Sequence, residues 1–352
     1  MSTHTSQPLV SIVTPVYNNE EYLAECIESV LAQTYQNWEY TIVNNCSTDG
    51  SAAIARRYAA QDSRIRVLDN EQFLRVVPNH NWALRQISPA SKYCKMVFSD
   101  DWIFPECLEQ MVAVAEKHPS IGIVGAYVLE GNAVSCTGLC YPSSFVTGRQ
   151  VCRDHLLKSV YVFGSPNSLL YRSDLVRSND PFFNVENIHA DTEVAFSLLR
   201  TCDFGFVHQV LTFTRVREGS MTGMALNLQA YLPGRLQILL AYGSDFLDPQ
   251  ERETLLANHL SDYYFSLGKS LLLGQKKVWD YHKAKLSASS VGFSRMRVVG
   301  GLFSVLGRVV SRPGEFMAKA LKKAPSSLPD RAQATEESGG HATVSAKEPR
   351  LG

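Results

Sequence analysis

The sequence has no excess of charge of either sign and no long apolar run. Its 34 basic and 34 acidic residues balance to a formal net charge of zero, which argues against a protein built to hold nucleic acid. No uninterrupted apolar run approaches the roughly 20 residues that a membrane span needs, and residues 1–8 lack an apolar signal region. The 352 residues are 45% hydrophobic, enough for a sizeable core in one large domain with a smaller part, or in two domains.

Closely spaced cysteines are also missing. The eight cysteines are scattered, and only Cys136 and Cys140 lie near each other, with no His or Cys partner at the spacing of a zinc site. This distribution suits a reducing cytoplasm better than a disulfide framework. No Gly-X-Gly-X-X-Gly pattern follows a predicted strand, which disfavours an oxidoreductase that binds a dinucleotide.

What the sequence does contain is a regular alternation of strands and helices up to Gly125. β-branched and apolar runs predict the strands, and stretches with apolar residues at helical spacing separate them. Pro15 is expected to stop the first strand. Strands that alternate with helices form a parallel sheet covered on both faces, so we predict an α/β fold with a mostly parallel sheet. The predicted strands are residues 9–14, 38–43, 65–68, 93–98 and 121–124.

Two adjacent carboxylates, Asp100 and Asp101, follow the buried run that ends at Phe98. Side chains at the carboxyl end of a central strand lie in the crevice where open α/β sheets bind ligands. Neighbouring carboxylates repel each other unless a positive group is present, and a hard divalent cation with its phosphates commonly supplies that charge. The alternative is that the two residues only cap the helix that begins near Pro105.

The second half is less regular and leads into a helical region. Short strands are predicted at 168–171, 204–207 and 211–215, and Asp191 opens a helix through Leu199. We divide the chain into a domain of residues 1–225 with halves 9–125 and 126–225, a helical extension 226–290, a basic helical segment 291–323, and a tail 324–352. The tail is rich in Pro, Ser, Gly, Ala, Glu and Lys and is predicted to be disordered.

The segment from Arg295 to Lys323 is basic, with seven Lys or Arg residues and the single acid Glu315. An apolar stripe at helical spacing runs along it through Val298, Leu302, Val305, Leu306 and Val309. A basic amphipathic helix can lie on an anionic membrane surface. The alternative is a helix packed on the rest of the protein with a solvated basic face, because such stripes usually face a core.

Four motifs taken together resemble the family 2 glycosyltransferases, which have the GT-A fold and transfer a sugar from a nucleotide donor. In chain order they are Pro15-Val16-Tyr17-Asn18, the loop from Asn44 to Ser51, Ser99-Asp100-Asp101, and Asp191-Thr192-Glu193. The resemblance covers about residues 9–220 and is most specific over 9–110.

The resemblance implies that the first two motifs bind the donor's nucleotide. In the family, the loop that here holds Pro15 and Tyr17 contacts the base, and a Tyr offers a flat face for stacking and a hydroxyl. Ordinary loop packing is the alternative for Tyr17. Asn44 stands where the family has a carboxylate that accepts the imide N–H of a uracil-type base. An Asn oxygen can accept the same bond, but its NH₂ group adds a donor, so the base stays open.

The third motif is where the resemblance implies a divalent cation, Mg²⁺ or Mn²⁺, that binds the donor's diphosphate. Phe98 takes the first Asp position of the family's Asp-X-Asp motif. We assign Asp101 to the metal and Asp100 to the metal or the ribose. Arg75, before the helix expected around Trp82, is a candidate partner of the donor phosphates.

The fourth motif supplies the candidate catalytic base, Asp191. An inverting transfer needs a carboxylate that takes the proton of the acceptor hydroxyl, while a metal stabilises the departing nucleoside diphosphate. Ala190 replaces the first acid of the family's pair, and a helix N-cap is a second role compatible with the first. Arg217 stands at the His position of a family Arg-X-His segment. A guanidinium cannot ligate a cation, but it can grip a diphosphate, the alternative being an ordinary surface Arg.

These residues predict an inverting glycosyltransferase that moves a sugar from a nucleoside-diphosphate sugar to a hydroxyl of a saccharide or lipid-linked acceptor, in surface polysaccharide biosynthesis. We expect it in the cytoplasm, at the inner face of the cytoplasmic membrane if residues 295–323 bind there. The acids missing at Phe98, Asn44 and Ala190 keep open a catalytically silent scaffold that binds nucleotide sugars. A nucleotidyltransferase is a further alternative, disfavoured because residues 15–20 are acidic and aromatic rather than glycine-rich and basic.

Overall fold

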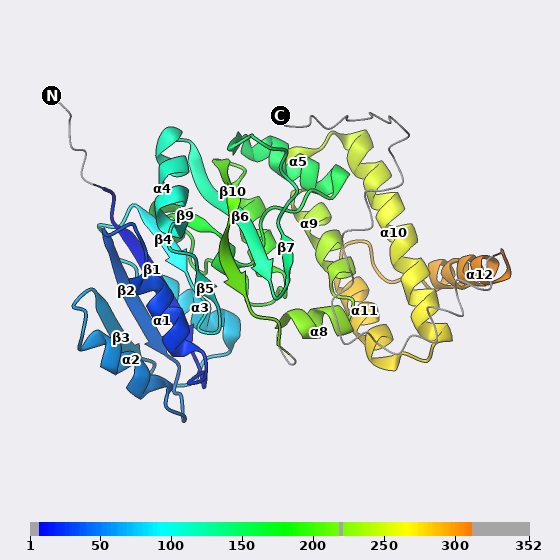
Figure 1. The fold of residues 1–352 in the computed structure, drawn as a ribbon. Coiled ribbons are helices and arrows are strands. Elements are labelled where there is room, and N and C mark those ends of the chain that lie inside the picture. Colours follow the sequence, from blue (N-terminus) through cyan, green and yellow to red (C-terminus); the bar gives the residue numbers. More distant parts are fainter. Residues whose placement is uncertain (1–6, 218–220, 312–352) are drawn as a thin grey trace, which may run out of the picture.

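The computed structural model describes residues 7–217 and 221–311, and its centre is a ten-stranded sheet (Figure 1). The sheet order is β3-β2-β1-β4-β9-β6-β10-β5, with β7 beside β6 and β8 beside β10. The strands are β1 Val10–Val16, β2 Trp38–Asn44, β3 Ile65–Asp69, β4 Tyr93–Met96, β5 Trp102–Ile103, β6 Ile121–Glu130, β7 Ala133–Ser135, β8 Phe145–Val146, β9 Leu170–Arg172 and β10 Asp203–Thr214. The helices are α1 Leu23–Leu31, α2 Ser51–Ala59, α3 Val76–Leu84, α4 Cys107–Lys117, α5 Gly148–Lys158, α6 Ser173–Arg177, α7 Ala190–Leu198, α8 Met221–Asn227, α9 Tyr231–Phe246, α10 Pro249–Leu272, α11 Lys276–Ala288 and α12 Arg295–Ser311.

Strand β1 sends its side chains into two core layers on opposite faces of the sheet. Ile12 packs in the layer built with α1, α2 and α4, whereas Val13 packs in the layer built with α3, α5, α7 and α9. Every residue of β1 is buried, as expected for a strand covered on both faces. The predicted α/β fold with helices on both faces is therefore confirmed.

The expectation that Pro15 stops the first strand is wrong, because β1 continues through Val16. The carbonyl of Val16 accepts a bond from Asn45 on the β2 side, and the carbonyl of Val13 accepts one from Val97 on the β4 side. Alternation along the strand turns the Pro15 nitrogen toward β4, which has already ended at Met96. No ladder bond is lost there, so the strand tolerates a proline.

The chain beyond β4 differs from the sequence prediction in its strand bounds. β4 ends at Met96 rather than Phe98, and the chain turns back as the short strand β5, antiparallel to β10. The strands predicted at 204–207 and 211–215 are one strand, β10, whose register against β6 shifts between Val207 and Val210 and again before Thr212. These irregularities break the period-two pattern, which is why the sequence suggested two strands.

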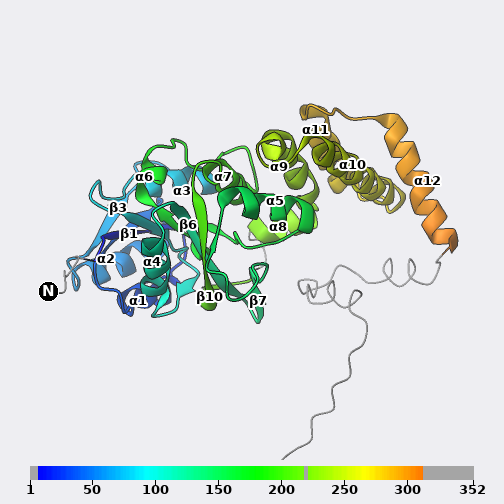
Figure 2. The same cartoon turned by 90° about the horizontal axis from the view of Figure 1, so that it is seen from above.

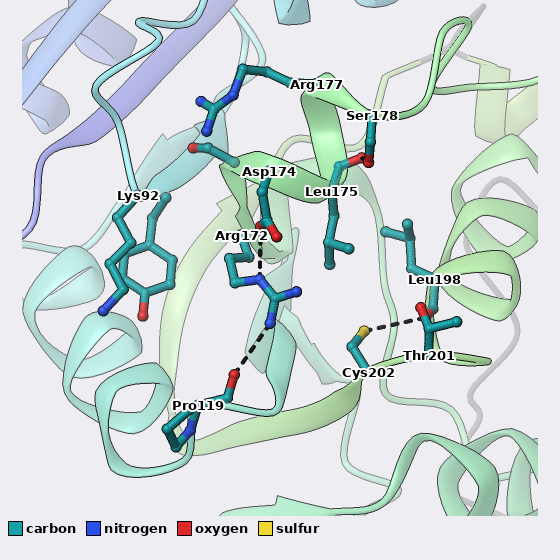
Figure 3. Close-up of polar contacts among 12 residues, drawn as sticks. Lys92, Pro119, Arg172, Asp174, Leu175, Arg177, Ser178, Leu198, Thr201 and Cys202 are labelled. Atoms are coloured by element: carbon teal, nitrogen blue, oxygen red, sulfur yellow. Dashed lines mark hydrogen bonds and ion pairs between the residues drawn. The ribbon is translucent and has the colours of Figure 1, made fainter.

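The short strand β9 is antiparallel to both of its neighbours, β4 and β6, whereas the long strands of the sheet are parallel to one another. Arg172, at its end, donates to the Asp174 carboxylate at 2.7 Å and to the Pro119 carbonyl at 3.2 Å (Figure 3). Pro119 precedes β6, so this arginine ties the reversed strand to the beginning of its neighbour. Figure 3 also shows the Cys202 thiol directed at the Leu198 carbonyl, 3.3 Å away, at the turn from α7 to β10.

The helices after β10 form a separate small core beside the sheet. Side chains of α9, α10, α11 and α12 make up this core, and α12 lies at the edge of the molecule farthest from β1–β3 (Figure 2). Val298 and Val305 of the predicted stripe are buried, whereas Leu306 is exposed, so the stripe faces the core only in part. No helix within the described residues is both apolar enough and long enough to span a bilayer. Residues 312–323 of the predicted basic segment and the predicted tail 324–352 lie outside the described residues.

Candidate active site

The site residues expected from the first half lie along the carboxyl edge of the sheet. Val16 pairs with Asn44 in parallel register, and Asn44 pairs with Asp69 at the end of β3. Tyr17 follows β1 directly, and the two Asp residues follow β4, which is parallel to β1 on its other side. Parallel neighbours end at the same edge, which is where open α/β sheets bind ligands.

The two carboxylates after β4 have different surroundings. Asp101 is buried, and its Oδ1 accepts the backbone N–H of Arg215 at 2.8 Å. Burial raises the pKa of Asp101 to about 8, and the nearby charge of Asp100 adds to the rise. Asp100 is more accessible and forms an ion pair with the guanidinium of Arg217. Helix capping by these residues is not observed, because the N-cap of α4 is Glu106.

Asn19 joins three of the loops at this edge and was not predicted from the sequence. Its Nδ2 donates to Ser99 Oγ at 2.7 Å, and its Oδ1 accepts from Arg217 at 3.3 Å. Its backbone N–H donates to Ser51 Oγ at 2.8 Å. The only sequence signal is its place in the polar loop after β1, beside Asn18.

Arg215 fastens the end of β10 to the Asp pair. Its Nε donates to the Asp100 carbonyl at 3.0 Å, and its guanidinium pairs with Glu25 at 2.6 Å. The same guanidinium lies over the Tyr22 ring, 4.1 Å from its centre. Both arginines of the 215–217 segment therefore contact the Asp pair. Arg215 binds the Asp101 carboxylate through its backbone N–H and the Asp100 carbonyl through its side chain, and Arg217 forms an ion pair with the Asp100 carboxylate.

The Asp pair fits a hard divalent cation held by few protein oxygens. Mg²⁺ sites often use one or two carboxylates and take their other ligands from substrate phosphates and water. Within residues 7–217 and 221–311 no group of three or more His, Cys, Asp or Glu side chains could hold a metal by itself. Burial is the main cause of the raised pKa of Asp101 and the charge of Asp100 adds to it, so a cation beside the two carboxylates would favour their ionised forms. Asp100 and Asp101 are the residues that could hold the cation, and Asp100 is the more accessible.

At the β1–β2 end of the edge, two exposed aromatic rings lie against each other. The Tyr17 and Phe73 ring centroids are 4.8 Å apart with the planes tilted by 59°. Phe73 lies in the loop after β3 and was missed, because a single aromatic in a polar loop carries no periodic signal. Pro15, by contrast, is buried inside β1, so the structure leaves its ring facing the core rather than the edge.

The amide of Asn44 is held in one orientation. Its Nδ2 donates to Asp69 Oδ1 at 2.7 Å, and its Oδ1 accepts the backbone N–H of Ser47 at 3.2 Å. The bond from Asn44 is the main cause of the lowered pKa of Asp69, to which Arg56 also contributes. An amide oxygen accepts two bonds, so Asn44 Oδ1 keeps one acceptor position for a ligand.

Arg75 is the N-cap residue of α3, a helix that begins earlier than expected, at Val76. Its side chain is exposed and makes no hydrogen bond or ion pair with any part of the chain that the structure describes. The neighbouring Leu74 N–H and carbonyl both bind the Asn45 side chain, which follows Asn44 at the end of β2. Arg75, two residues after Phe73, thus offers a positive charge that no side chain of the described residues engages.

In the second half, Asp191 lies in the first turn of α7, and its contacts differ from those of its acidic neighbour Glu193. Its Oδ1 accepts the N–H of Thr192 at 2.7 Å, and burial raises its pKa despite this bond and the nearby His189. Glu193 is occupied by structure, since its carboxylate accepts bonds from Asn184 and Asn187 at 2.6–3.2 Å. His189 binds the Ala230 carbonyl at 3.0 Å and so braces the start of α9.

Besides the polar contacts of Arg215 and Arg217 with the Asp pair, apolar contacts connect the two halves of the domain. Phe98, at the acid position that this sequence lacks, packs against the core cluster that contains Ala190 and Val194 of α7. His80 of α3 stacks on Phe98 with ring centroids 4.9 Å apart. Phe98 and α7 therefore contribute to the same buried core.

Comparison with known proteins identifies the domain. Residues 11–175 match the family model described as glycosyl transferase family 2. These residues form a family 2 glycosyltransferase domain. The protein EpsE of Bacillus subtilis (strain 168), which carries a glycosyltransferase name, is 40% identical over 125 residues, covering 35% of this chain and 44% of EpsE. The chain spans less than half the length of curated relatives such as this one.

The fold of the glycosyltransferase domain and its helical extension also matches solved structures. S. aureus TarS 1-349 in complex with UDP-GlcNAc superimposes with a TM-score of 0.64 at 18% identity, over 86% of this chain and 91% of that chain. The mannosyltransferase PcManGT of Pyrobaculum calidifontis, in complex with GDP-Man and Mn²⁺, gives a TM-score of 0.50 at 15% identity, over 90% of this chain and 84% of that chain. At these identities the likeness establishes the predicted GT-A architecture.

Proposed function

We propose that the chain is an inverting glycosyltransferase that moves a sugar from a nucleoside-diphosphate sugar to a hydroxyl of a saccharide or lipid-linked acceptor. One observation carries the proposal more than any other. The family 2 domain has two adjacent carboxylates, Asp100 and Asp101, at the carboxyl edge of its sheet, with Arg217 in contact with Asp100. Such an edge suits a diphosphate with a divalent cation.

The donor would lie along this edge. Tyr17 and Phe73 give the nucleotide base an aromatic surface, and Asn44 Oδ1 gives it one hydrogen-bond acceptor. Arg75 and Arg217 would hold the diphosphate, Arg217 by exchanging the Asp100 carboxylate for phosphate oxygens. Mg²⁺ or Mn²⁺ bound at Asp100 and Asp101 would supply charge that stabilises the departing nucleoside diphosphate. The PcManGT complex with GDP-Man and Mn²⁺ supports a cofactor of this kind in the same fold.

Asp191 would take the proton from the acceptor hydroxyl. Burial raises its pKa, and a carboxylate with a raised pKa is a stronger base once it is ionised. Glu193 is unsuited to this role because two asparagine side chains already bind its carboxylate. The acceptor class, a growing surface polysaccharide or a lipid-linked saccharide at the cytoplasmic membrane face, is part of the same proposal.

The test compares Asp191→Asn with Glu193→Gln, its acidic neighbour in the same turn of α7. Sugar transfer is measured with Mn²⁺, a set of common sugar nucleotides and acceptor extracts. We expect Asp191→Asn to lower turnover about a hundredfold or more, because general base catalysis typically contributes that much. Glu193→Gln keeps the oxygen that accepts from the loop and should retain most of the activity.

Donor binding is measured separately, by thermal shift with nucleoside diphosphates with and without Mn²⁺, since a ligand of the folded form raises the melting temperature. Both variants should keep the shift of the unmodified protein. Unchanged turnover in Asp191→Asn would remove this residue as the base. Donor binding without transfer by the unmodified protein, for every donor tried, would favour the silent scaffold.

A further inference from the structure

Helix α12 has an apolar face that no other part of the described chain covers. Met296, Val299, Phe303, Leu306 and Val310 recur at steps of three and four residues, which puts them on one side of the helix. Their exposed fractions are 85%, 49%, 70%, 47% and 82%. Single exposed apolar side chains are ordinary, but a contiguous row along a helix indicates an interaction surface.

The direction of this outer face is fixed by the packing of another side of the helix. Val298 and Val305 are buried, and Val298 belongs to the core that α12 shares with α10. The two helices approach so closely that a Cβ added to Gly301 would lie 2.1 Å from the Tyr264 carbonyl oxygen. The helix is therefore docked on α10, and its outer row faces away from the docking site.

A second exposed apolar group lies near the same crossing. Leu271, Leu272 and Leu273 end α10 with exposed fractions of 40–46%, one helical turn beyond Gly268, which meets Gly301. The exposed Lys276 and Lys277 follow directly. Both views place this end of α10 and α12 on the side of the molecule away from the first strands (Figures 1 and 2).

The charge of this region favours one kind of partner. α12 contains Arg295, Arg297 and Arg308 and no acidic residue. The sequence from 295 to 323 has seven basic residues and one acidic residue, which leaves 27 basic and 33 acidic residues in the rest of the chain. A second copy of α12 would bring like charges together, whereas an anionic bilayer attracts them and accepts the apolar row.

We infer that the outer face of α12 is a docking surface for an anionic membrane. The apolar row enters the boundary between headgroups and acyl chains, and Arg295, one helical turn before Val299, lies on the same side near lipid phosphates. Arg297 and Arg308 lie over the Tyr264 and Phe265 rings of α10 and attract the anionic surface from the far side of the helix. This deepens the location given in the proposed function, and it concerns a surface remote from the Asp pair. Membrane binding therefore needs neither donor nor acceptor, and the inference can be tested independently of sugar transfer.

The test is co-sedimentation of the full chain with vesicles, without donor or acceptor. One set of vesicles contains phosphatidylglycerol in phosphatidylcholine, and the other contains phosphatidylcholine alone. We expect binding to the anionic vesicles, weaker binding to the neutral ones, and a decrease with added salt. Phe303→Ser should reduce partitioning about tenfold, the value of removing one large apolar side chain from a buried position.

Val299→Glu and Val134→Glu form a matched pair, since the two valines are 49% and 50% exposed and Val134 lies on β7. Only Val299→Glu should weaken vesicle binding. Both sites are exposed, so circular dichroism should show unchanged folding. The inference is overturned if the unmodified chain does not co-sediment with anionic vesicles, or if Phe303→Ser and Val299→Glu bind these vesicles as strongly as the unmodified chain. It is also overturned if light scattering shows a dimer that Phe303→Ser dissociates while vesicles bind nothing, because the face then belongs to a second copy.

Discussion

At the scale of single residues, Asp100 has two candidate partners that need the same carboxylate. The guanidinium of Arg217 pairs with it in the structure, and a divalent cation would use the same oxygens. The two positive groups therefore compete until a diphosphate provides Arg217 with another partner. Donor and cation are expected to bind cooperatively, because each removes an obstacle to the other.

Arg217→Gln tests this competition. Without nucleotide, the variant should bind Mn²⁺ about twofold to fivefold more tightly, since a partly exposed ion pair is worth up to about 1 kcal/mol. With a nucleoside diphosphate present, the gain should disappear because the diphosphate has lost a partner. Titration calorimetry gives both affinities. Arg85→Gln, which removes an arginine from the exposed pair with Asp180, is the control. Equal Mn²⁺ affinity in the two variants would show that Arg217 does not restrain Asp100.

Asp101 should make the metal-free protein less stable as the pH rises. Its pKa in the folded state is about 8, whereas an Asp in an unfolded chain titrates near pH ~4. Between these values the folded state retains a proton that the unfolded state releases, so the free energy of unfolding falls with increasing pH. Asp101→Asn cannot ionise and should gain about 1–3 kcal/mol relative to the unmodified protein between pH 5.5 and 8. Urea unfolding in EDTA at both pH values measures the difference, and an equal difference at both would contradict the assignment.

At the scale of elements, the crossing of α10 and α12 depends on Gly301, which has no room for a side chain, whereas the adjacent Gly300 has room for one. A Cβ on Gly301 would collide with the Tyr264 backbone, whereas a Cβ on Gly300 would meet nothing within 4 Å. Gly301→Ala should destabilise the docking of α12 by about 1–3 kcal/mol, as overpacking usually does. Gly300→Ala should be neutral or stabilise the helix by up to about 1 kcal/mol, because Ala is the better helix former.

Limited proteolysis around residues 289–311, together with thermal unfolding, compares the two alanine variants. Cleavage should become faster only in Gly301→Ala, because only that variant separates α12 from α10. If both variants were cleaved at the same rate, the close approach of the two helices would not be what holds α12 in place.

Strands of the first half could be predicted because their apolar runs are continuous, as burial on both faces requires. The orientation of β9 could not be predicted, since its three residues carry no signal of direction and its partner strands, β4 and β6, are distant in the sequence. The same holds for β5, a two-residue strand defined only by its pairing with β10. Short elements take their structure from tertiary contacts that no local pattern contains.

At the scale of the whole molecule, the sequence located the carboxyl edge of the sheet but not the network along it. Asn44 and the Asp pair could be placed there because Asn44 ends β2 and the Asp pair comes shortly after β4, both strands of the parallel sheet. Asn19 and Phe73 could not, since their roles depend on which loops fold together over long sequence separations. Asn and Phe are common in loops, so the residue types of Asn19 and Phe73 carry no signal, and only the folded structure shows their partners.

Helix α9 belongs to two cores at once: Ile238 and Leu239 pack under the sheet, and Leu232 and Leu236 pack with α10–α12. Helix α9 is thus shared between the core of the sheet domain and the core of the helices that follow it. Removing α10–α12 would uncover apolar surface in both cores, at Leu232 and Leu236 of α9 and where Leu255 and Leu256 of α10 pack on the sheet core.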